Sequence, residues 1–264
     1  MPPWQRPLHS MNGCGRSPSG KFKYGSVPMS QLILNESDYN NVIEVPRSGV
    51  LDATISTGER ARLHEIVEAD ERIESLLIPA QCIAARNRAL ARQIVRDYAP
   101  AKHLEVLVVL TGGVIFASDI CRDIFSEGNI HARFNLIKTS VYDSSIKGSG
   151  EEYRAVRLLM EPQDVEGKDV LIMEDITDQG FTLTWMLNYL RNERRVNSVK
   201  ICSLLDKRLA NPTEKVKLLR DNLTVDYRGF IIEDQWIAGY GIDTADDFRN
   251  LPFIVVINEG FFKG

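Results

Sequence analysis

One run, VLIMEDITDQGFTL at residues 170–183, constrains the fold of this chain more than any other segment. It opens with apolar residues, continues into Glu174, Asp175 and Asp178, and reaches Gly180 just before a predicted helix. A short apolar run of this kind is typical of a buried parallel strand. In open α/β sheets ligands bind beyond the carboxyl ends of the strands, and acids clustered there are costly unless they bind something. The run therefore predicts a ligand site at a strand–helix junction.

The same run has the features of an anion site. The backbone amides from Gln179 to Thr182 are expected to point out of a helix N-terminus, and Gly180 lets the backbone approach a phosphate closely. The preceding carboxylates suit hydroxyl groups or a metal ion, so the whole run suits a ribose 5-phosphate. The simpler interpretation is a helix start with acids that favour its dipole. That would be preferred for a lone acidic pair, but the full strand–E-D-x-x-D-x-G–helix context favours the ligand site.

The remaining pattern predicts an α/β fold in which a parallel sheet is covered by helices on both faces. The expected strands are 106–110, 133–141, 155–160, 170–173 and 199–205, alternating with helices over 115–125 and 182–194. After about Leu209 no helix is expected, and short strands and turns indicate a small C-terminal lobe.

Two helices are expected before the first of these strands. Thr57 is a candidate cap for a helix through Ala69, and Pro79 is expected to open a second helix. The second helix has apolar residues on its inner face, and a run of arginines is expected on its solvated face: Arg86, Arg88, Arg92 and Arg96.

Residues 1–35 differ from the rest because they contain no Asp or Glu and are rich in Pro, Gly and Ser. A disordered tail is the preferred interpretation, and a transit peptide is the alternative. Met29 is a plausible alternative start. The expected domain is then residues 36–264, with a core at about 59–208 and a hood at about 209–264 that takes an N-terminal contribution.

Charge and cysteine usage exclude several classes of protein. The net charge of -4 gives no reason to expect binding along nucleic-acid phosphates. No apolar run reaches the length of roughly 18 residues that a membrane span needs. The four cysteines are far apart and form no C-x-x-C pair, so a reducing compartment is expected. A cytoplasmic location follows, with an organelle left open by the N-terminal tail.

The run at 170–183 resembles the phosphoribosyl-pyrophosphate-binding signature of type I phosphoribosyltransferases. That signature has a short apolar strand, E-D, two apolar residues, D-T-G, and a small or basic residue before Thr. This chain departs from it at Gln179, where Thr is usual, and at Phe181.

Four further motifs, in the family's order, narrow the resemblance to the hypoxanthine-guanine branch. Residues 110–113 (LTGG) resemble a pyrophosphate loop L-K-G-G, with Thr111 in place of Lys, and the family implies a cis peptide there. The others are 203–208 (SLLDKR), 235–243 (QWIAGYGID) and 248–251 (FRNL). The resemblance covers about residues 72–258 and implies a parallel α/β core with a small C-terminal hood over the base.

The resemblance implies a role for each matching residue. Asp178 is expected to be the general base, and Glu174 and Asp175 are expected to hold the ribose hydroxyls. The 5-phosphate loop is expected to consist of Gln179, Gly180, Phe181 and Thr182. Pyrophosphate contacts are expected from Thr111, Gly112 and Arg249. The purine base is expected to meet the Lys207 amine at its 6-oxo group, the Trp236 ring and the Ile237 carbonyl. Magnesium is the implied cofactor, held by Asp243 with Glu174 and Asp175.

The implied reaction joins a 6-oxopurine base to ribose 5-phosphate taken from phosphoribosyl pyrophosphate, and the choice among hypoxanthine, guanine and xanthine stays open. Residues 139–151 resemble the family's mobile flap, with a plain hairpin loop as the alternative. A homodimer or homotetramer is expected from the resemblance. One alternative is a regulator that binds phosphoribosyl pyrophosphate without catalysis, but no basic helix-turn-helix precedes the core. Another is a transferase for adenine, orotate or uracil, against which Lys207 followed by Trp236 argues.

Overall fold

A seven-stranded sheet forms the centre of the protein in the computed structural model, which describes residues 31–99, 101–144 and 153–262. All neighbouring strands in it are parallel except the last pair, β6 and β7. The order is β2 (Ile43–Val45), β10 (Tyr227–Glu233), β9 (Ser198–Arg208), β8 (Asp169–Thr177), β5 (His103–Leu110), β6 (His131–Ser144) and β7 (Tyr153–Met160). The predicted α/β class with a parallel sheet is confirmed.

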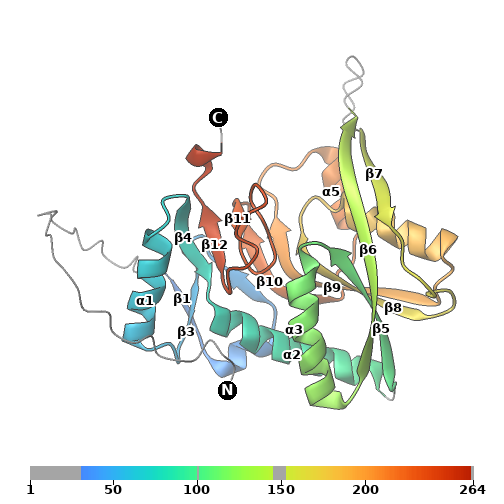
Figure 1. Ribbon diagram of the computed structural model, residues 1–264, viewed down its shortest axis with the longest axis horizontal. Helices are drawn as coiled ribbons and strands as arrows, with labels where there is room; N and C mark the ends of the chain where they lie inside the picture. Colours follow the sequence, from blue (N-terminus) through green and yellow to red (C-terminus); the bar gives the residue numbers. More distant parts are fainter. Residues whose placement is uncertain (1–30, 100, 145–152, 263–264) are drawn as a thin grey trace, which may run out of the picture.

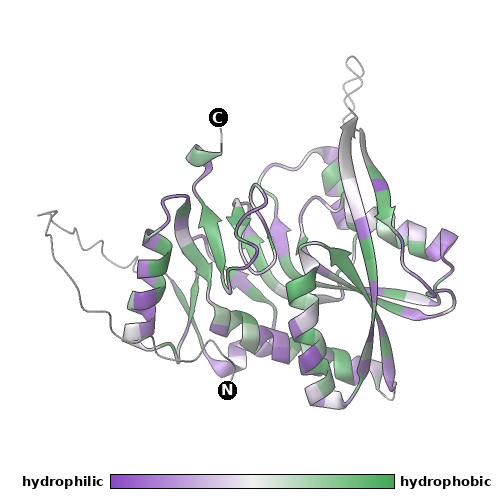
Figure 2. Ribbon diagram, in the orientation of Figure 1, coloured by the Kyte–Doolittle hydropathy of each residue, from purple (hydrophilic) through white to green (hydrophobic). Residues whose placement is uncertain are grey.

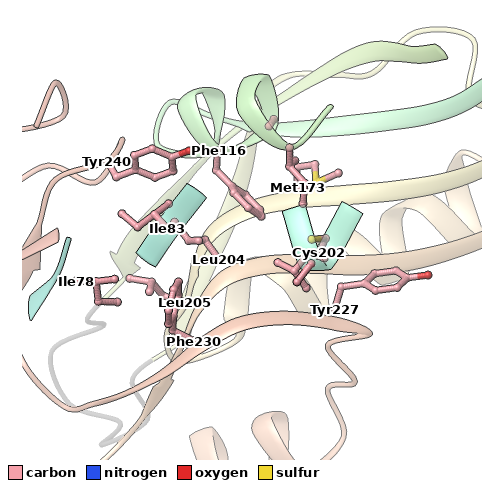
Figure 3. Close-up of a cluster of buried hydrophobic side chains, with 14 of the residues drawn as sticks. Ile78, Ile83, Phe116, Met173, Cys202, Leu204, Leu205, Tyr227, Phe230 and Tyr240 are labelled. Atoms are coloured by element: carbon pink, nitrogen blue, oxygen red, sulfur yellow. The ribbon is translucent and has the colours of Figure 1, made fainter. Parts of the chain in front are cut away.

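Helices cover both faces of this sheet, so its inner strands are apolar on both sides, as the hydropathy colouring shows (Figure 2). On one face, α2 (Ala80–Tyr98) and α3 (Gly113–Gly128) pack over side chains such as Met173 and Leu204 (Figure 3). Val106 belongs to the same cluster. On the other face, α4 (Phe181–Asn188) and the π-helical turn Tyr189–Glu193 pack over alternate residues of the same strands, including Leu107 and Ile172. The alternation follows from the two-residue period of a strand.

A second, smaller layer joins the C-terminal hood to segments from the N-terminal third of the chain. Its antiparallel sheet runs β11 (Ile237–Ala238), β12 (Ile254–Ile257) and β4 (Ile73–Ile78), with α1 (Thr57–Glu68) packed beside β4 (Figure 1). Apolar side chains from both ends of the chain, among them Val67, Leu76 and Phe253, form its core. The remaining elements are β1 (Leu32–Leu34) paired with β3 (Val50–Asp52), and the short 3-10 turns Glu36–Asn40 and Glu259–Phe261.

The division into lobes differs from the expected residue ranges. β1 falls within the stretch 1–35 expected to be a tail, and β4 lies in the hood sheet although residues 59–208 were expected to form the core. Conversely, β10 follows residue 209 and yet belongs to the central sheet. Residues 1–30 lie outside the described part of the chain, so the expected tail, with the transit peptide as its alternative, stays a prediction.

Two predictions about helices were wrong. The prediction of no helix after Leu209 fails because α5 (Glu214–Asp221) forms there, with the Thr213 side chain accepting a hydrogen bond from the Val216 amide at 3.3 Å. The cap of α1 is Ser56, one residue earlier than expected, because Ser56 and Glu59 form a capping box.

Arg86 was expected on the solvated face of its helix, but only 1% of it is exposed. Its guanidinium donates to the backbone carbonyls of Tyr39 at 2.6 Å, Gly229 at 3.0 Å and Arg228 at 2.5 Å. Burial lowers the pKa of this guanidinium to about 10. The buried cation therefore ties α2 to β10 and to the N-terminal 3-10 turn.

Candidate active site

The carboxyl ends of β5, β8 and β9 meet at one edge of the sheet, because these strands are parallel neighbours. In the register between β8 and β9, Thr177 is paired with Asp206. Asp178 and Lys207 each come one residue after this pair, at the carboxyl ends of adjacent strands, and neighbouring strands are about 4.8 Å apart. The register therefore places two residues expected to act on the same ligand at the same edge of the sheet.

A cavity of about 300 Å³ opens at this edge. Its lining consists of Val109, Thr139, Glu174, Asp175, Ile176, Asp178, Gln179, Gly180, Phe181, Thr182 and Leu183. Both expected carboxylates for a ribose, the expected general base and the whole expected phosphate loop therefore surround one space. Thr139 comes from β6, whose hairpin with β7 projects beyond the sheet (Figure 1). The tip of the expected flap, 145–152, lies outside the described residues.

Glu174, which is buried, and Asp175, which is half-buried, form an acidic pair that lines this cavity. Burial raises the pKa of Glu174 well above its usual range, and the neighbouring Asp175 carboxylate raises it further. Burial also raises the pKa of Asp175, although hydrogen bonds from Glu174 and the Ile176 amide and the charge of Arg249 act in the opposite direction. Two adjacent carboxyls that resist joint ionisation favour a ligand that brings positive charge or hydroxyl donors.

The phosphate loop turns sharply at Gly180, which has φ +85 and caps the N-terminus of α4. Glycine adopts this left-handed conformation without the steric cost of a side chain. Residues 180–183, at the N-terminus of α4, line the cavity, and a helix N-terminus favours an anion. The ring of Phe181 has the Lys215 ammonium 5.7 Å from its centroid, which brings α5 against this loop.

The expected pyrophosphate loop lies directly against the acidic pair. The peptide bond between Leu110 and Thr111 is cis, as the resemblance implies. A Cβ on Gly112 would lie 1.6 Å from an Asp175 carboxylate oxygen, and a Cβ on Gly241 would lie 2.2 Å from the Gly112 carbonyl oxygen. Both close approaches require glycine. The hood turn around Gly241 therefore packs on the pyrophosphate loop, and this loop packs on Asp175.

Arg249 and Asp243 belong to the same hood turn and contact each other. The Arg249 guanidinium is 2.6 Å from an Asp243 carboxylate oxygen and donates to the Gly241 carbonyl at 2.8 Å. The second Asp243 oxygen accepts from the Asp246 amide at 3.0 Å. Asp243 therefore already forms an ion pair with Arg249, and a metal ion bound by Asp243 would lie next to this guanidinium.

The residues expected to contact a base come from β9, from β11 and from the segment before β11, and none of them is among the residues that line this cavity. Lys207 is the last residue but one of β9, with its side chain 13% exposed and its ammonium 3.9 Å from an Asp234 carboxylate oxygen. Trp236 is 36% exposed, and its ring centroid is 5.6 Å from that of Phe262. Ile237 is buried in β11. A charged donor and a large ring on neighbouring segments are suited to a planar, polar heterocycle.

One residue near the site, Arg220, was missed in the sequence analysis, whereas Thr139, which lines the cavity, was expected only as the first residue of the flap. Arg220, on α5, forms an ion pair with Asp206 and approaches the carbonyls of Thr177 and Lys207. The signal that would have found Arg220 is the Pro212–Thr213 helix start ahead of it.

The acidic pair fits a magnesium ion better than it fits a closed metal cage. Among the residues described by the structure, no group of three His, Cys, Asp or Glu side chains is arranged to hold a metal. Magnesium in phosphate-transfer sites is usually held by one or two carboxylates together with the substrate's phosphates. The raised pKa of Glu174 marks the place where such a charge would be stabilising.

Known proteins that are similar to this chain are phosphoribosyltransferases. Residues 77–244 match the model of the phosphoribosyl transferase domain. The hypoxanthine phosphoribosyltransferase of Escherichia coli is 36% identical over 181 residues, covering 68% of this chain and 92% of its own. The hypoxanthine-guanine phosphoribosyltransferase of Mycobacterium tuberculosis is 33% identical over 217 residues, covering 80% of this chain and 96% of its own.

Solved structures agree as well. A Trypanosoma cruzi hypoxanthine phosphoribosyltransferase variant, complexed with the product IMP, has a TM-score of 0.61 at 31% identity and covers 73% of this chain and 94% of its own. The chain belongs to the phosphoribosyltransferase family and has the type I fold. Within that family it falls in the hypoxanthine-guanine branch, so the predicted resemblance is confirmed.

No helix among the described residues is both long and apolar enough to cross a membrane.

Proposed function

We propose that this protein is a purine salvage transferase that moves the 5-phosphoribosyl group of phosphoribosyl pyrophosphate onto hypoxanthine, guanine or xanthine. The products are the nucleoside monophosphate and pyrophosphate. The observation that carries the proposal is the shared cavity of Glu174, Asp175, Asp178 and the 179–182 loop, with Lys207 on the adjacent strand end.

The phosphoribosyl half of the site follows from the cavity. The amides of the loop formed by Gln179, Gly180, Phe181 and Thr182 bind the 5-phosphate, because they open a helix whose first donors have no internal acceptor. The Glu174 and Asp175 carboxylates accept hydrogen bonds from the ribose hydroxyls. Burial strengthens these bonds by excluding water.

The pyrophosphate is bound by the loop of Thr111 and Gly112 together with Arg249. An arginine has five N–H donors, and its contacts with Asp243 and Gly241 leave donors for diphosphate oxygens. Magnesium, when bound, supplies charge neutralisation of the diphosphate and is held by Glu174 and Asp175 with Asp243. Its proposed requirement is open to a direct test with a chelator.

The purine half uses three groups. Lys207 donates to the 6-oxo oxygen, the Trp236 ring stacks on the base, and the Ile237 carbonyl accepts from the exocyclic amine of guanine. A donor at the 6-position selects against adenine, which presents an amine there. Asp178 takes the proton from ring nitrogen 7 as the bond to the anomeric carbon forms. That carbon passes through a cationic state like that of glycoside hydrolysis, which nearby carboxylates stabilise.

A non-catalytic regulator of the same fold is not favoured, because the curated relatives are named as transferases and the chain has an Asp at 178 and a Lys at 207. The decisive experiment is a purine panel with phosphoribosyl pyrophosphate and magnesium, followed by separation of the nucleotides. We expect turnover of at least one 6-oxopurine, little turnover of adenine, and none in excess chelator. Turnover of adenine alone, or nucleotide binding without turnover of any base, would refute the proposal.

We also propose a homodimer or homotetramer, from the resemblance, and a cytoplasmic location, from the cysteine usage. Light scattering of the purified protein tests the oligomer. Fractionation of cells that express the full chain tests the location.

A further inference from the structure

Arg220 connects the ends of the two strands that carry the proposed general base and the proposed purine-reading lysine. Its guanidinium lies 3.5 Å from the Thr177 carbonyl oxygen and 3.4 Å from the Lys207 carbonyl oxygen, and it forms an ion pair with the Asp206 carboxylate. Thr177 immediately precedes Asp178. One side chain from α5 therefore touches both β8 and β9 at the point where their functional residues begin.

The separation of Asp178 and Lys207 matters for the proposed reaction. One group acts at ring nitrogen 7 and the other at the 6-oxo oxygen, and both atoms belong to the same rigid purine. Neighbouring parallel strands are joined by backbone hydrogen bonds only up to Thr177 and Asp206. Beyond that pair, the Arg220 guanidinium takes the place of the next backbone bonds, since its planar fork reaches more than one acceptor at a fixed spacing.

We propose that Arg220 is a positioning residue that sets the distance between Asp178 and Lys207 and so determines affinity for the purine base. The inference rests on the proposed function of this site. Arg220 itself is not among the residues that line the cavity.

The charge network around Arg220 allows this role to be separated from simple stabilisation. Asp206 is only 5% exposed and has a second cationic partner, Arg228, whose Nε lies 3.1 Å from the other carboxylate oxygen. Removal of Arg220 therefore leaves Asp206 paired, and a buried unpaired charge is avoided. The aliphatic stem of Arg220 also supports the phosphate loop, because its Cδ would lie 3.4 Å from a Cβ on Gly180.

Two variants of Arg220 and one control separate these contributions. Arg220→Met keeps an apolar stem under Gly180 and deletes the guanidinium. Arg220→Lys keeps a cation for Asp206, but one ammonium does not span both carbonyls as the guanidinium does. Arg228→Met is the matched control. It removes the other cation that pairs with Asp206, and it leaves the contacts of Arg220 with Thr177 and Lys207 in place. Each protein is assayed for KM of hypoxanthine, KM of phosphoribosyl pyrophosphate, kcat and Tm.

We expect both Arg220 variants to raise the KM for hypoxanthine, by about 10- to 100-fold for Met, since a misplacement of about 1 Å at a reacting group can cost on the order of 100-fold. The KM for phosphoribosyl pyrophosphate should stay within about twofold of wild type, as a two-fold change is well under 1 kcal/mol. Arg228→Met should change neither KM.

Equal effects of Arg220→Met and Arg228→Met would overturn the inference, because the loss of a cationic partner for Asp206 would then be the cause. An unchanged hypoxanthine KM, or a rise in both KM values together with a lower Tm, would overturn it as well. A wild-type protein that turns over no 6-oxopurine would instead refute the proposed function, and this inference with it.

Discussion

At the scale of single residues, the acidic pair of Glu174 and Asp175 shows how a binding site opposes stability. Burial raises the pKa of both carboxyls. A carboxyl with a raised folded-state pKa stabilises the fold below its unfolded pKa, and that stability is lost as pH rises through the folded value. At neutral pH the pair is therefore a cost that ligand binding offsets.

Replacement of Glu174 by Gln should remove this cost. We expect Glu174→Gln to raise the free energy of unfolding of the substrate-free protein by about 0.5–2 kcal/mol at pH 8 while greatly lowering turnover. The gain should be smaller at pH 5, because the raised pKa of Glu174 favours proton binding in the folded state as the pH falls. Denaturant unfolding at both pH values measures it. A variant less stable than wild type at pH 8 would contradict the assigned direction of the pKa shift.

Asp178 is the residue on which the chemistry depends. Asp178→Asn should lower kcat by about 10²–10⁴-fold, the usual cost of losing a general base, and leave the affinity for the product nucleotide within a few-fold. The exposed Asp221 on α5 gives a matched control, and Asp221→Asn should behave as wild type. Steady-state kinetics and calorimetric binding of the nucleotide check both statements. Turnover close to wild type in Asp178→Asn would show that another group takes the proton.

Lys207 and Trp236 allow the two modes of base recognition to be compared. Lys207→Ala deletes a charge-assisted donor and leaves the 6-oxo group unpaired, a loss of about 1–3 kcal/mol. Trp236→Phe keeps a stacking face and should cost less, because stacking is worth about 1–3 kcal/mol and most of it survives. The ratio of kcat/KM for hypoxanthine to that for adenine should fall in Lys207→Ala only. An unchanged ratio would mean that Lys207 does not read the 6-oxo group.

At the scale of elements, the contact between the hood turn and the pyrophosphate loop leaves no space for a side chain at Gly241. Gly241 has φ +100, and any Cβ there would lie 2.2 Å from the Gly112 carbonyl oxygen. Because the opposing atom belongs to the backbone, one of the two segments must move. The loop at Gly112 cannot withdraw freely, since it already contacts the Asp175 carboxylate.

Gly241→Ala should therefore lower stability by about 1–3 kcal/mol, the usual cost of a strained backbone residue, and raise the KM for phosphoribosyl pyrophosphate more than the KM for hypoxanthine. Gly58→Ala is the control, since nothing lies within 4 Å of a Cβ at that helical position. It should be neutral or slightly stabilising. The two KM values and Tm of each variant are the measurements, and an unaffected phosphoribosyl pyrophosphate KM in Gly241→Ala would argue against this contact.

At the scale of the whole molecule, Tyr240 fastens the hood to the core. Its hydroxyl donates to Asp119 on α3 at 2.7 Å and accepts from the Asn87 amide on α2 at 3.1 Å. Burial, followed by the hydrogen bond to Asp119, raises the pKa of Tyr240 well above its usual range, so the hydroxyl keeps its proton. The two lobes are therefore joined by a buried polar contact as well as by apolar packing (Figure 3).

Tyr240→Phe should lower the free energy of unfolding by about 1–3 kcal/mol, because the buried Asn87 amide loses its partner. It should also raise the KM for phosphoribosyl pyrophosphate, since Gly241 and Arg249 belong to the same hood turn. Tyr227→Phe makes the same chemical change within the core, where the hydroxyl donates to Asp97 at 2.7 Å. That control should lose stability without a change in KM, and parallel effects on KM in both variants would exclude a specific link through the hood.

Most strands of the central sheet, and the acids and glycine of residues 170–183 that line the cavity, could be predicted from the sequence. Buried parallel strands are continuously apolar, and the acids and glycines at their ends are local in the chain, so residues 170–183 predicted a strand, a turn and a helix without any distant contact. The family resemblance added the positions of Lys207, Trp236 and Arg249, which periodicity alone does not distinguish from surface or core residues.

Which distant segments share a layer depends on tertiary contacts that the sequence pattern does not reveal. β4 pairs with β12 across most of the chain, and Arg86, on α2, donates to carbonyl acceptors on β10 and on the N-terminal 3-10 turn. Arg220 contacts two strand ends from a helix that the turn-rich composition did not predict. Hydrophobic period and capping patterns report a residue's near neighbours along the chain. Whether a charged side chain is buried depends instead on acceptors that arrive from elsewhere, because hydrogen bonding and pairing offset its desolvation only once the fold has formed.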